Sequence, residues 1–138
     1  MALERPEGYV AGLPNCGVVA IAVMTGAHYT RVWNWFAKKQ VKPSAWKGRT
    51  MRRHYEAASL AMGVRLERLI VNRRITVAKF VELHTLPDVA YMVRVSGHVF
   101  VVHNGVITDN SVYSGAHVSE YGKRRCIVTD VWCSVARA

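Results

Sequence analysis

Three residues of this sequence have the types and the predicted placement needed for nucleophilic catalysis by a thiol: Cys16, His98 and Asp109. The reactive form of a cysteine is the thiolate, and the N–H groups at the start of a helix lower the pKa of a thiol placed there. Cys16 follows the turn signal Pro14-Asn15 and begins an apolar run, so it is expected in the first turn of a buried helix. Cys16 is therefore the candidate nucleophile; the alternative is a small apolar core residue.

Six histidines could supply the base that a catalytic thiol requires, and His98 has the most suitable context. It follows the turn predicted at 96–97 and begins a run rich in β-branched residues, so its ring is expected at the end of a strand. His103 falls at a predicted hairpin tip, where we expect it to be solvated. The remaining four lie in predicted helices or loops: His28, His54, His84 and His117.

A hairpin signal independently places Asp109 near His98. Asn104-Gly105 is the strongest two-residue turn signal in the sequence. Counting outward from that turn, Phe100 pairs with Asp109, and strand alternation puts His98 and Asp109 on one face. Their α-carbons would be diagonal neighbours at roughly 7–8 Å, which allows a carboxylate to reach and orient an imidazole. Asp109 is therefore the candidate orienting residue.

Alternatives remain open at both ends of this constellation. Asp109 could instead cap the strand end, and a bulge or a one-residue slip would turn it to the opposite face. Asn110 would then be the substitute orienting residue. At the nucleophile, the backbone N–H of Cys16 is a candidate donor to an oxyanion.

The order of predicted elements is α+β, with helices first and an antiparallel sheet after them. Helical spacing and capping residues, with Asn15 and Thr50 among the caps, predict four helices: 16–24, 30–40, 51–62 and 77–83. Alternation and β-branched content predict five strands: 66–71, 89–95, 98–102, 106–109 and 126–135. The 138 residues suit a single domain, residues 1–138, with the first helix buried at its centre.

The chain carries a formal net charge of +10, from 19 Lys and Arg against 9 Asp and Glu. Such a charge attracts polyanions, so a nucleic acid or an acidic protein is a candidate partner through a basic face. A solvated basic surface without a dedicated partner fits equally well, because the basic residues are scattered and form no run of five.

The three cysteines, Cys16, Cys126 and Cys133, lack the number and spacing of a disulfide framework, so reduced thiols and a cytoplasmic location are predicted. The uncharged stretch 8–30 is interrupted by Pro14 and glycines and falls short of the roughly 20 apolar residues of a membrane span, so no membrane association is predicted. The cysteines are not paired as Cys-x-x-Cys, and neither a metal nor another cofactor is expected. The oligomeric state is left open.

The motifs around the candidate residues resemble those of the papain-like cysteine peptidase superfamily. The resemblance is carried by NCGVVA at 15–20 and by GHVFVV at 97–102 followed by Asn104-Gly105 and Asp109. A closer likeness, through Thr25-Gly26, is to small phage- and plasmid-encoded relatives of the bacteriocin-leader-processing peptidases. It implies a papain-like fold and a hydrolase that cleaves a peptide, isopeptide or related acyl bond of a peptide or protein. It also implies the triad named above and, for a phage protein, the cytoplasm of a bacterial host.

One departure from the family pattern concerns the oxyanion donor. Papain-like enzymes usually carry a Gln a few residues before the cysteine, whereas this chain has Val10 there and no Gln upstream of Cys16. Asn15 supplies the nearest side-chain amide and is the second candidate donor. Two other readings stay open: an inactive relative that binds a host protein or nucleic acid through its basic face, and an acyl transferase of the transglutaminase kind.

Overall fold

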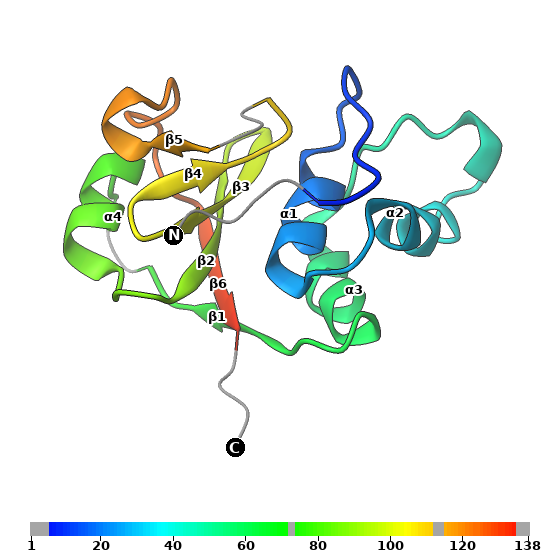
Figure 1. Ribbon diagram of the computed structural model, residues 1–138, viewed down its shortest axis with the longest axis horizontal. Coiled ribbons are helices and arrows are strands. Elements are labelled where there is room, and N and C mark those ends of the chain that lie inside the picture. Colours follow the sequence, from blue (N-terminus) through cyan, green and yellow to red (C-terminus); the bar gives the residue numbers. More distant parts are fainter. Residues whose placement is uncertain (1–5, 72–73, 112–114, 135–138) are drawn as a thin grey trace.

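The computed structural model describes residues 6–71, 74–111 and 115–134. The described chain is α+β, as the sequence predicts, with one antiparallel sheet (Figure 1). Its α-helices are α1 (Cys16–Thr25), α2 (Tyr29–Ala37), α3 (Tyr55–Ala61) and α4 (Val77–His84). Its strands are β1 (Leu66–Leu69), β2 (Ala90–Val95), β3 (His98–His103), β4 (Val106–Thr108), β5 (Ala116–His117) and β6 (Asp130–Ser134).

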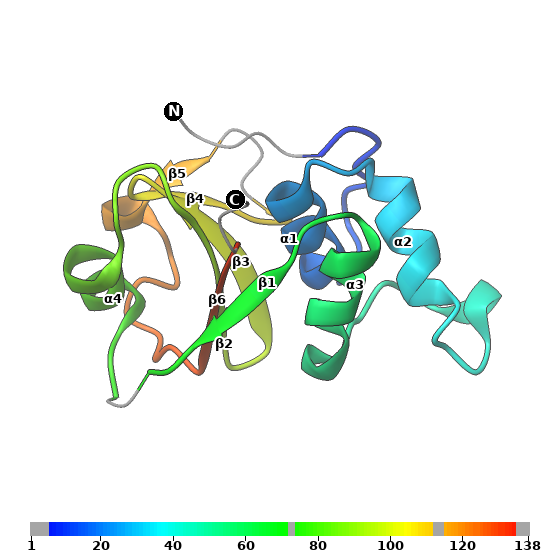
Figure 2. The ribbon, with the colours of Figure 1, turned by 90° about the horizontal axis from the view of Figure 1, so that it is seen from below.

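The sheet has helices on both faces. Its six strands lie in the order β1-β6-β2-β3-β4-β5, and every neighbouring pair is antiparallel. Figures 1 and 2 show α1, α2 and α3 gathered on one side of the sheet and α4 on the other. The last strand, β6, lies between β1 and β2, so it joins the segment after α3 to the central hairpin.

Alternate residues of β3 enter two separate cores. Val99 and Val101 pack with α1, α2 and α3, whereas Phe100 and Val102 pack on the other face with α4. Each fully buried Val or Phe contributes about 1.5–3 kcal/mol relative to an exposed one. A one-residue slip of β3 would exchange the two sets, so burial on both faces holds this strand in one register.

The helix α1 is apolar on every side and lies inside the first core, with Gly17 to Ala22 buried. Asn15 stands at its N-cap position, but its side chain does not make the predicted capping hydrogen bond; Gly26 ends the helix in the left-handed region at φ 72°. The Gly26 N–H donates to the Ala22 carbonyl over 2.9 Å, which closes the last turn. Cys16 is therefore the first residue of a helix that cannot shift without opening the core.

The hairpin of β3 and β4 has the register that the sequence predicts. Asn104 and Gly105 both have positive φ, 50° and 77°, as a type I′ turn requires. His103 pairs with Val106, and the pairing continues outward to the end of β4. β3 begins at His98, and Asp109 directly follows β4, so the two residues lie at the same end of the hairpin.

Two predicted elements begin later in the structure than in the prediction, the predicted helix 30–40 and strand 66–71 end earlier, at Ala37 and Leu69, and the short strand β5 was not predicted. The predicted helix 51–62 begins as a 3-10 turn, Arg52–His54, before α3, and Thr50 does not cap it because its hydroxyl pairs with the Tyr55 hydroxyl instead. The predicted strand 126–135 begins only at Asp130, because residues before it pass beside α4: the Val77 N–H donates to the Cys126 carbonyl. Residue 135 lies outside the described residues.

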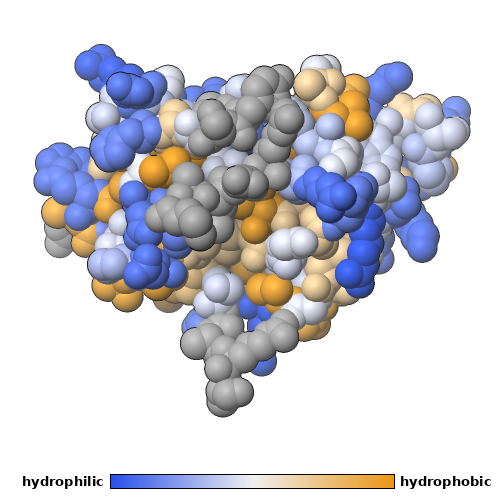
Figure 3. All heavy atoms as spheres, viewed as in Figure 1, coloured by the Kyte–Doolittle hydropathy of each residue, from blue (hydrophilic) through white to orange (hydrophobic). Residues whose placement is uncertain are grey.

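The surface combines hydrophilic and apolar areas. Figure 3 shows hydrophilic residues at the two sides of the viewed face and more apolar ones between them. Within the described ranges, no helix is both long and apolar enough to cross a bilayer.

Candidate active site

The sulfur of Cys16 lies where the first turn of α1 meets the start of β3. The Cys16 side chain is half-buried, and His98, Val99 and Gly17 are the groups whose hydrogen-bonding capacity favours its thiolate form. Burial alone would raise the pKa of the thiol. The hydrogen bonds and the His98 charge outweigh burial, and the pKa of Cys16 falls below its ordinary value.

The structure brings His98 and Asp109 into direct contact. His98 Nε2 lies 2.8 Å from Asp109 Oδ2, and the His98 ring stacks on Phe100 at 6.0 Å between centroids. The His98 side chain is 11% exposed and that of Asp109 only 1%. This close, buried pair fixes the plane of the imidazole ring.

Both ring nitrogens of His98 have assigned directions. Nε2 faces the Asp109 carboxylate, so Nδ1 is the nitrogen that remains for the Cys16 thiol. Burial would lower the pKa of His98, but the hydrogen bonds to Asp109 and Cys16 and the charges of both raise it to about 9. The lowered pKa of Cys16 and the raised pKa of His98 both favour the thiolate–imidazolium form of the pair.

Every lone-pair direction of the Asp109 carboxylate is used. Oδ1 accepts from the N–H and the hydroxyl of Ser111, each at 2.8 Å, and Oδ2 accepts from the Tyr121 hydroxyl at 2.7 Å besides His98. Burial would raise the pKa of Asp109, but these hydrogen bonds hold it well below its usual range. Asp109 therefore stays ionised opposite His98.

Tyr121 is a site residue that the sequence did not reveal. It is buried, and its hydroxyl oxygen also lies 3.1 Å from His98 Nε2. Burial and the neighbouring Asp109 raise its pKa, so the hydroxyl remains a donor to the carboxylate. Tyr121 follows the 3-10 turn Val118–Glu120, and no spacing in the sequence connects this turn with the hairpin. Tyr121 positions Asp109 and thereby His98.

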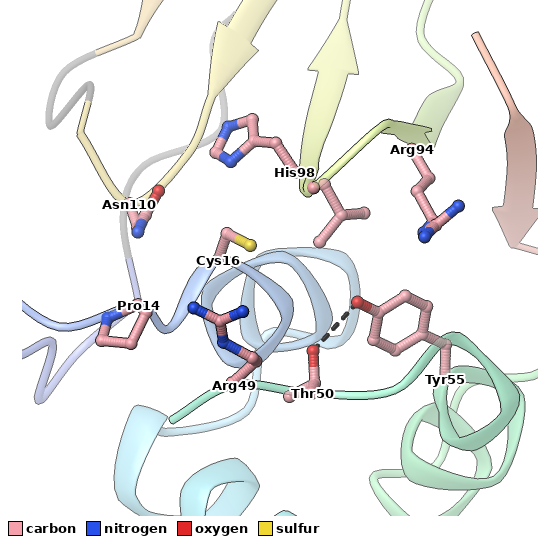
Figure 4. A pocket seen from close by; sticks show the side chains of 10 residues that line it. Pro14, Cys16, Arg49, Thr50, Tyr55, Arg94, His98 and Asn110 are labelled. Atoms are coloured by element: carbon pink, nitrogen blue, oxygen red, sulfur yellow. Dashed lines mark hydrogen bonds between the residues drawn. The ribbon is translucent and has the colours of Figure 1, made fainter. Parts of the chain in front are cut away.

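A cleft of about 340 Å³ opens beside the Cys16 sulfur (Figure 4). This volume is at the lower end of ligand pockets, enough for one or two residues of a peptide. Figure 4 shows His98 on one side of Cys16 and Arg49 and Thr50 on the other. The cleft is lined by Pro14, Cys16, Arg49, Thr50, Tyr55, Arg94, Gly97, His98, Val99 and Asn110.

The wall opposite His98 is a loop that the sequence did not single out. Gly48, at φ 108°, is buried against Trp33 and Asn15: a Cβ there would lie 2.9 Å from the Trp33 ring. The Trp46 indole N–H donates to the Arg49 carbonyl over 2.7 Å. Gly48 and this hydrogen bond together place Arg49 and Thr50 over the start of α1.

The two asparagines considered for the site have structural roles here. The Asn15 side-chain amide is fully buried, and its Nδ2 donates to the Val10 carbonyl at 2.9 Å and to the Tyr29 hydroxyl at 2.7 Å. Both of its N–H donors are therefore used, and neither remains for an oxyanion. Asn110 Nδ2 donates to the Leu13 carbonyl at 3.3 Å, so this side chain holds the segment before α1 rather than His98.

The backbone N–H of Cys16 remains available as a donor to an oxyanion. It belongs to the first turn of α1, where N–H groups have no partner within the helix. No hydrogen bond of the described chain uses it.

Replacing Gly17 with alanine tests how tightly this loop covers α1. The added Cβ would overlap Thr50 Oγ1 and lie 2.9 Å from Thr50 Cβ, so the variant is expected to lose about 1–3 kcal/mol of unfolding free energy. Combining it with Thr50→Ala should recover part of that loss in denaturant titrations. Costs that simply add in the double variant would contradict the contact.

The remaining histidines and cysteines do not join this site. His103 lies at the far end of β3, and Cys126 and Cys133 are half-buried free thiols at the border of the second core. Among the residues with described positions, no three His, Cys, Asp or Glu are grouped so that they could hold a metal ion. No protein-family model, curated protein or solved structure matches the chain, so the interpretation of the site rests on its own geometry.

Proposed function

We propose that the protein is a thiol hydrolase of the cysteine peptidase type, with Cys16 as nucleophile, His98 as acid and base, and Asp109 as the orienting residue. The observation that carries the proposal is that Cys16 and His98 line the same cleft, His98 lowers the pKa of the Cys16 thiol, and His98 Nε2 lies 2.8 Å from the buried Asp109 carboxylate. A cysteine that begins a buried helix, together with a histidine at the start of β3 and an aspartate directly after β4, also supports a papain-like assignment of the fold.

The first half of the reaction forms a thioester. The Cys16 thiolate attacks the carbonyl carbon of the substrate, and the oxyanion forms near the Cys16 N–H. His98 Nδ1 then gives its proton to the leaving amine, the C–N bond breaks, and the amine departs. Asp109 holds the ring in place and stabilises the imidazolium until that proton is transferred.

The second half of the reaction restores the free enzyme. The neutral His98 takes a proton from a water molecule, whose oxygen attacks the thioester carbonyl. The C–S bond breaks, the carboxylic acid product leaves, and Cys16 returns as the thiolate beside the imidazolium. An amine in place of water would give acyl transfer, so the ratio of these products decides between hydrolase and transferase.

Alkylation with iodoacetamide at pH 7, followed by peptide mass mapping, tests the first requirement. All three cysteines are half-buried, so differences in rate reflect activation more than access. Cys16 is expected to react at least about tenfold faster than Cys133, whose pKa is raised by burial and by Glu67. Equal rates at the two sites would remove the basis for thiol catalysis.

Hydrolysis itself can be measured with a mixed peptide library. New N-termini are expected with the wild-type chain and none with Cys16→Ser, which keeps the volume of the side chain but not its acidity. If neither protein cleaves the library and Cys16 is also unreactive, the basic net charge of +10 favours the alternative of an inactive binding protein. Binding to nucleic acid that weakens steeply with salt would then support that alternative.

A further inference from the structure

We propose that the cleft beside Cys16 binds a carboxylate of the substrate, with Arg49 as its main ligand and Arg94 as the second. This inference rests on the proposed function, because it names the substrate class of the same site. The carboxylate could belong to an Asp or Glu side chain next to the scissile bond or to a free C-terminus, and both would present the same two oxygens to a guanidinium.

Arg49 is exposed, and its backbone is positioned by the loop that precedes it. The Trp46 indole fixes its carbonyl, and Gly48 allows the chain to pass close over Trp33 and Asn15. Figure 4 shows the Arg49 guanidinium turned toward Cys16 across the cleft. Within the described chain, no carboxylate forms an ion pair with Arg49. Its five N–H donors are thus presented to the cleft without a fixed counter-charge.

Arg94 reaches the cleft from β2, on another side (Figure 4). Its Nη1 lies 3.3 Å from Asp130 Oδ2 and 3.1 Å from Thr129 Oγ1, which fixes the position of the guanidinium. Asp130 also pairs with Arg52 and Arg68, so one buried carboxylate balances three arginines. The excess of positive charge in this cluster leaves Arg94 able to attract an anion in the cleft.

Apart from the Cys16 thiolate, which pairs with His98, no negative side chain opposes the two arginines within the cleft. None of the residues that line it is acidic, and the Asp109 carboxylate is buried behind His98, where it is 1% exposed. A neutral or basic substrate group would gain nothing from this lining, whereas a carboxylate would gain charge-assisted hydrogen bonds.

Two small alkylating agents of nearly the same shape test the proposal without a known substrate. Iodoacetate carries a carboxylate and iodoacetamide does not. The measured quantity is the rate with iodoacetate divided by the rate with iodoacetamide. This ratio is expected to be about tenfold higher at Cys16 than at Cys133. In Arg49→Gln the ratio at Cys16 is expected to fall about three- to tenfold. Lys47→Gln, a change of the same charge in the same loop but outside the cleft, should leave the ratio unchanged.

The rate ratio separates the two proposals from each other. If iodoacetamide does not favour Cys16 in the wild-type chain, the proposed function fails. If it does, but Arg49→Gln and Lys47→Gln change the ratio equally, only the carboxylate site is overturned. The His98 imidazolium also attracts iodoacetate, but it is present in all of these proteins. Its contribution therefore cancels when the variants are compared.

Competition experiments then distinguish the source of the carboxylate. Dipeptides with a free C-terminus and the matching C-terminal amides are added during iodoacetamide labelling of Cys16. If only the dipeptides with a free C-terminus protect Cys16, the cleft binds a C-terminal carboxylate. If a dipeptide amide that contains Glu protects Cys16 but the matching amide with Gln does not, the cleft binds an acidic side chain. Equal protection by acid, amide, Glu and Gln forms would contradict the proposal.

Discussion

In the His98→Ala variant, iodoacetamide is expected to alkylate Cys16 about 100-fold more slowly than in the wild-type protein at pH 6.5. Without the hydrogen bond and the charge of His98, burial becomes the dominant influence on the Cys16 thiol and raises its pKa. Even a thiol of ordinary pKa, about 8.5, is only about 1% thiolate at pH 6.5. The measurement is the rate constant for iodoacetamide at Cys16 across pH 5–10, by mass mapping.

The shape of the pH profile identifies the cause of that loss. In the wild-type chain the thiolate–imidazolium pair is the main form at pH values between the lowered pKa of Cys16 and the pKa of His98, which is about 9. Hydrolysis should therefore fall off on both sides of this pH range. In His98→Ala the thiolate should appear only at alkaline pH, and added imidazole should restore part of the rate.

A matched control is His103→Ala, which removes the same side chain from the opposite end of β3. It is expected to leave the alkylation profile of Cys16 unchanged, because His103 lies at the turn end of the hairpin, away from the cleft. If both alanine variants lowered the rate equally, a general loosening of β3 would explain the effect and the specific role of His98 would be wrong.

Asp109→Asn is expected to lower the unfolding free energy by about 3 kcal/mol at pH 6. The Asp109 carboxylate is 1% exposed and accepts hydrogen bonds from His98, Tyr121 and Ser111. The amide of asparagine would place an N–H₂ group against one of these donors and would leave the imidazolium without its counter-charge. Denaturant titration of both proteins measures the difference.

The pH dependence of this difference has a definite sign. The lowered pKa of Asp109 stabilises the fold above its unfolded value of about 4, and that stabilisation is lost in acid. The raised pKa of His98 stabilises the fold fully below 6.5, and that stabilisation is lost as pH rises through about 9. The gap between wild type and variant should therefore be widest between about pH 4 and 6.5.

The same variant should also shift catalysis. With the carboxylate gone, the pKa of His98 falls, and the alkaline limb of the activity profile should move to lower pH. Asp88→Asn is the control: Asp88 is exposed in the turn before β2, and asparagine can also adopt its positive φ of 60°. An unchanged stability gap from pH 3 to 9 would contradict the proposed pairing of Asp109 with His98.

The local half of the site followed from the sequence alone. Asn104-Gly105 is a turn of one type and one length, so it determines which residues of β3 and β4 face each other. The pairing of His98 with Asp109 is a consequence of that register and of strand alternation. The start of α1 at Cys16 likewise followed from a turn signal and an apolar run within a few residues. Such features depend on neighbours in sequence, whose geometry the residue types restrict directly.

Tertiary structure decided the other half. The meeting of Cys16 with His98 joins segments 82 positions apart and depends on how α1 packs against β3. Tyr121 reaches Asp109 only because the chain after β5 folds back over the second core, and β6 lies between β1 and β2 for a similar reason. Arg49 lines the cleft opposite His98 because Gly48 allows the chain to pass over the Trp33 ring. These contacts arise from the joint burial of distant apolar faces, and no spacing in the chain encodes which distant face will be the partner.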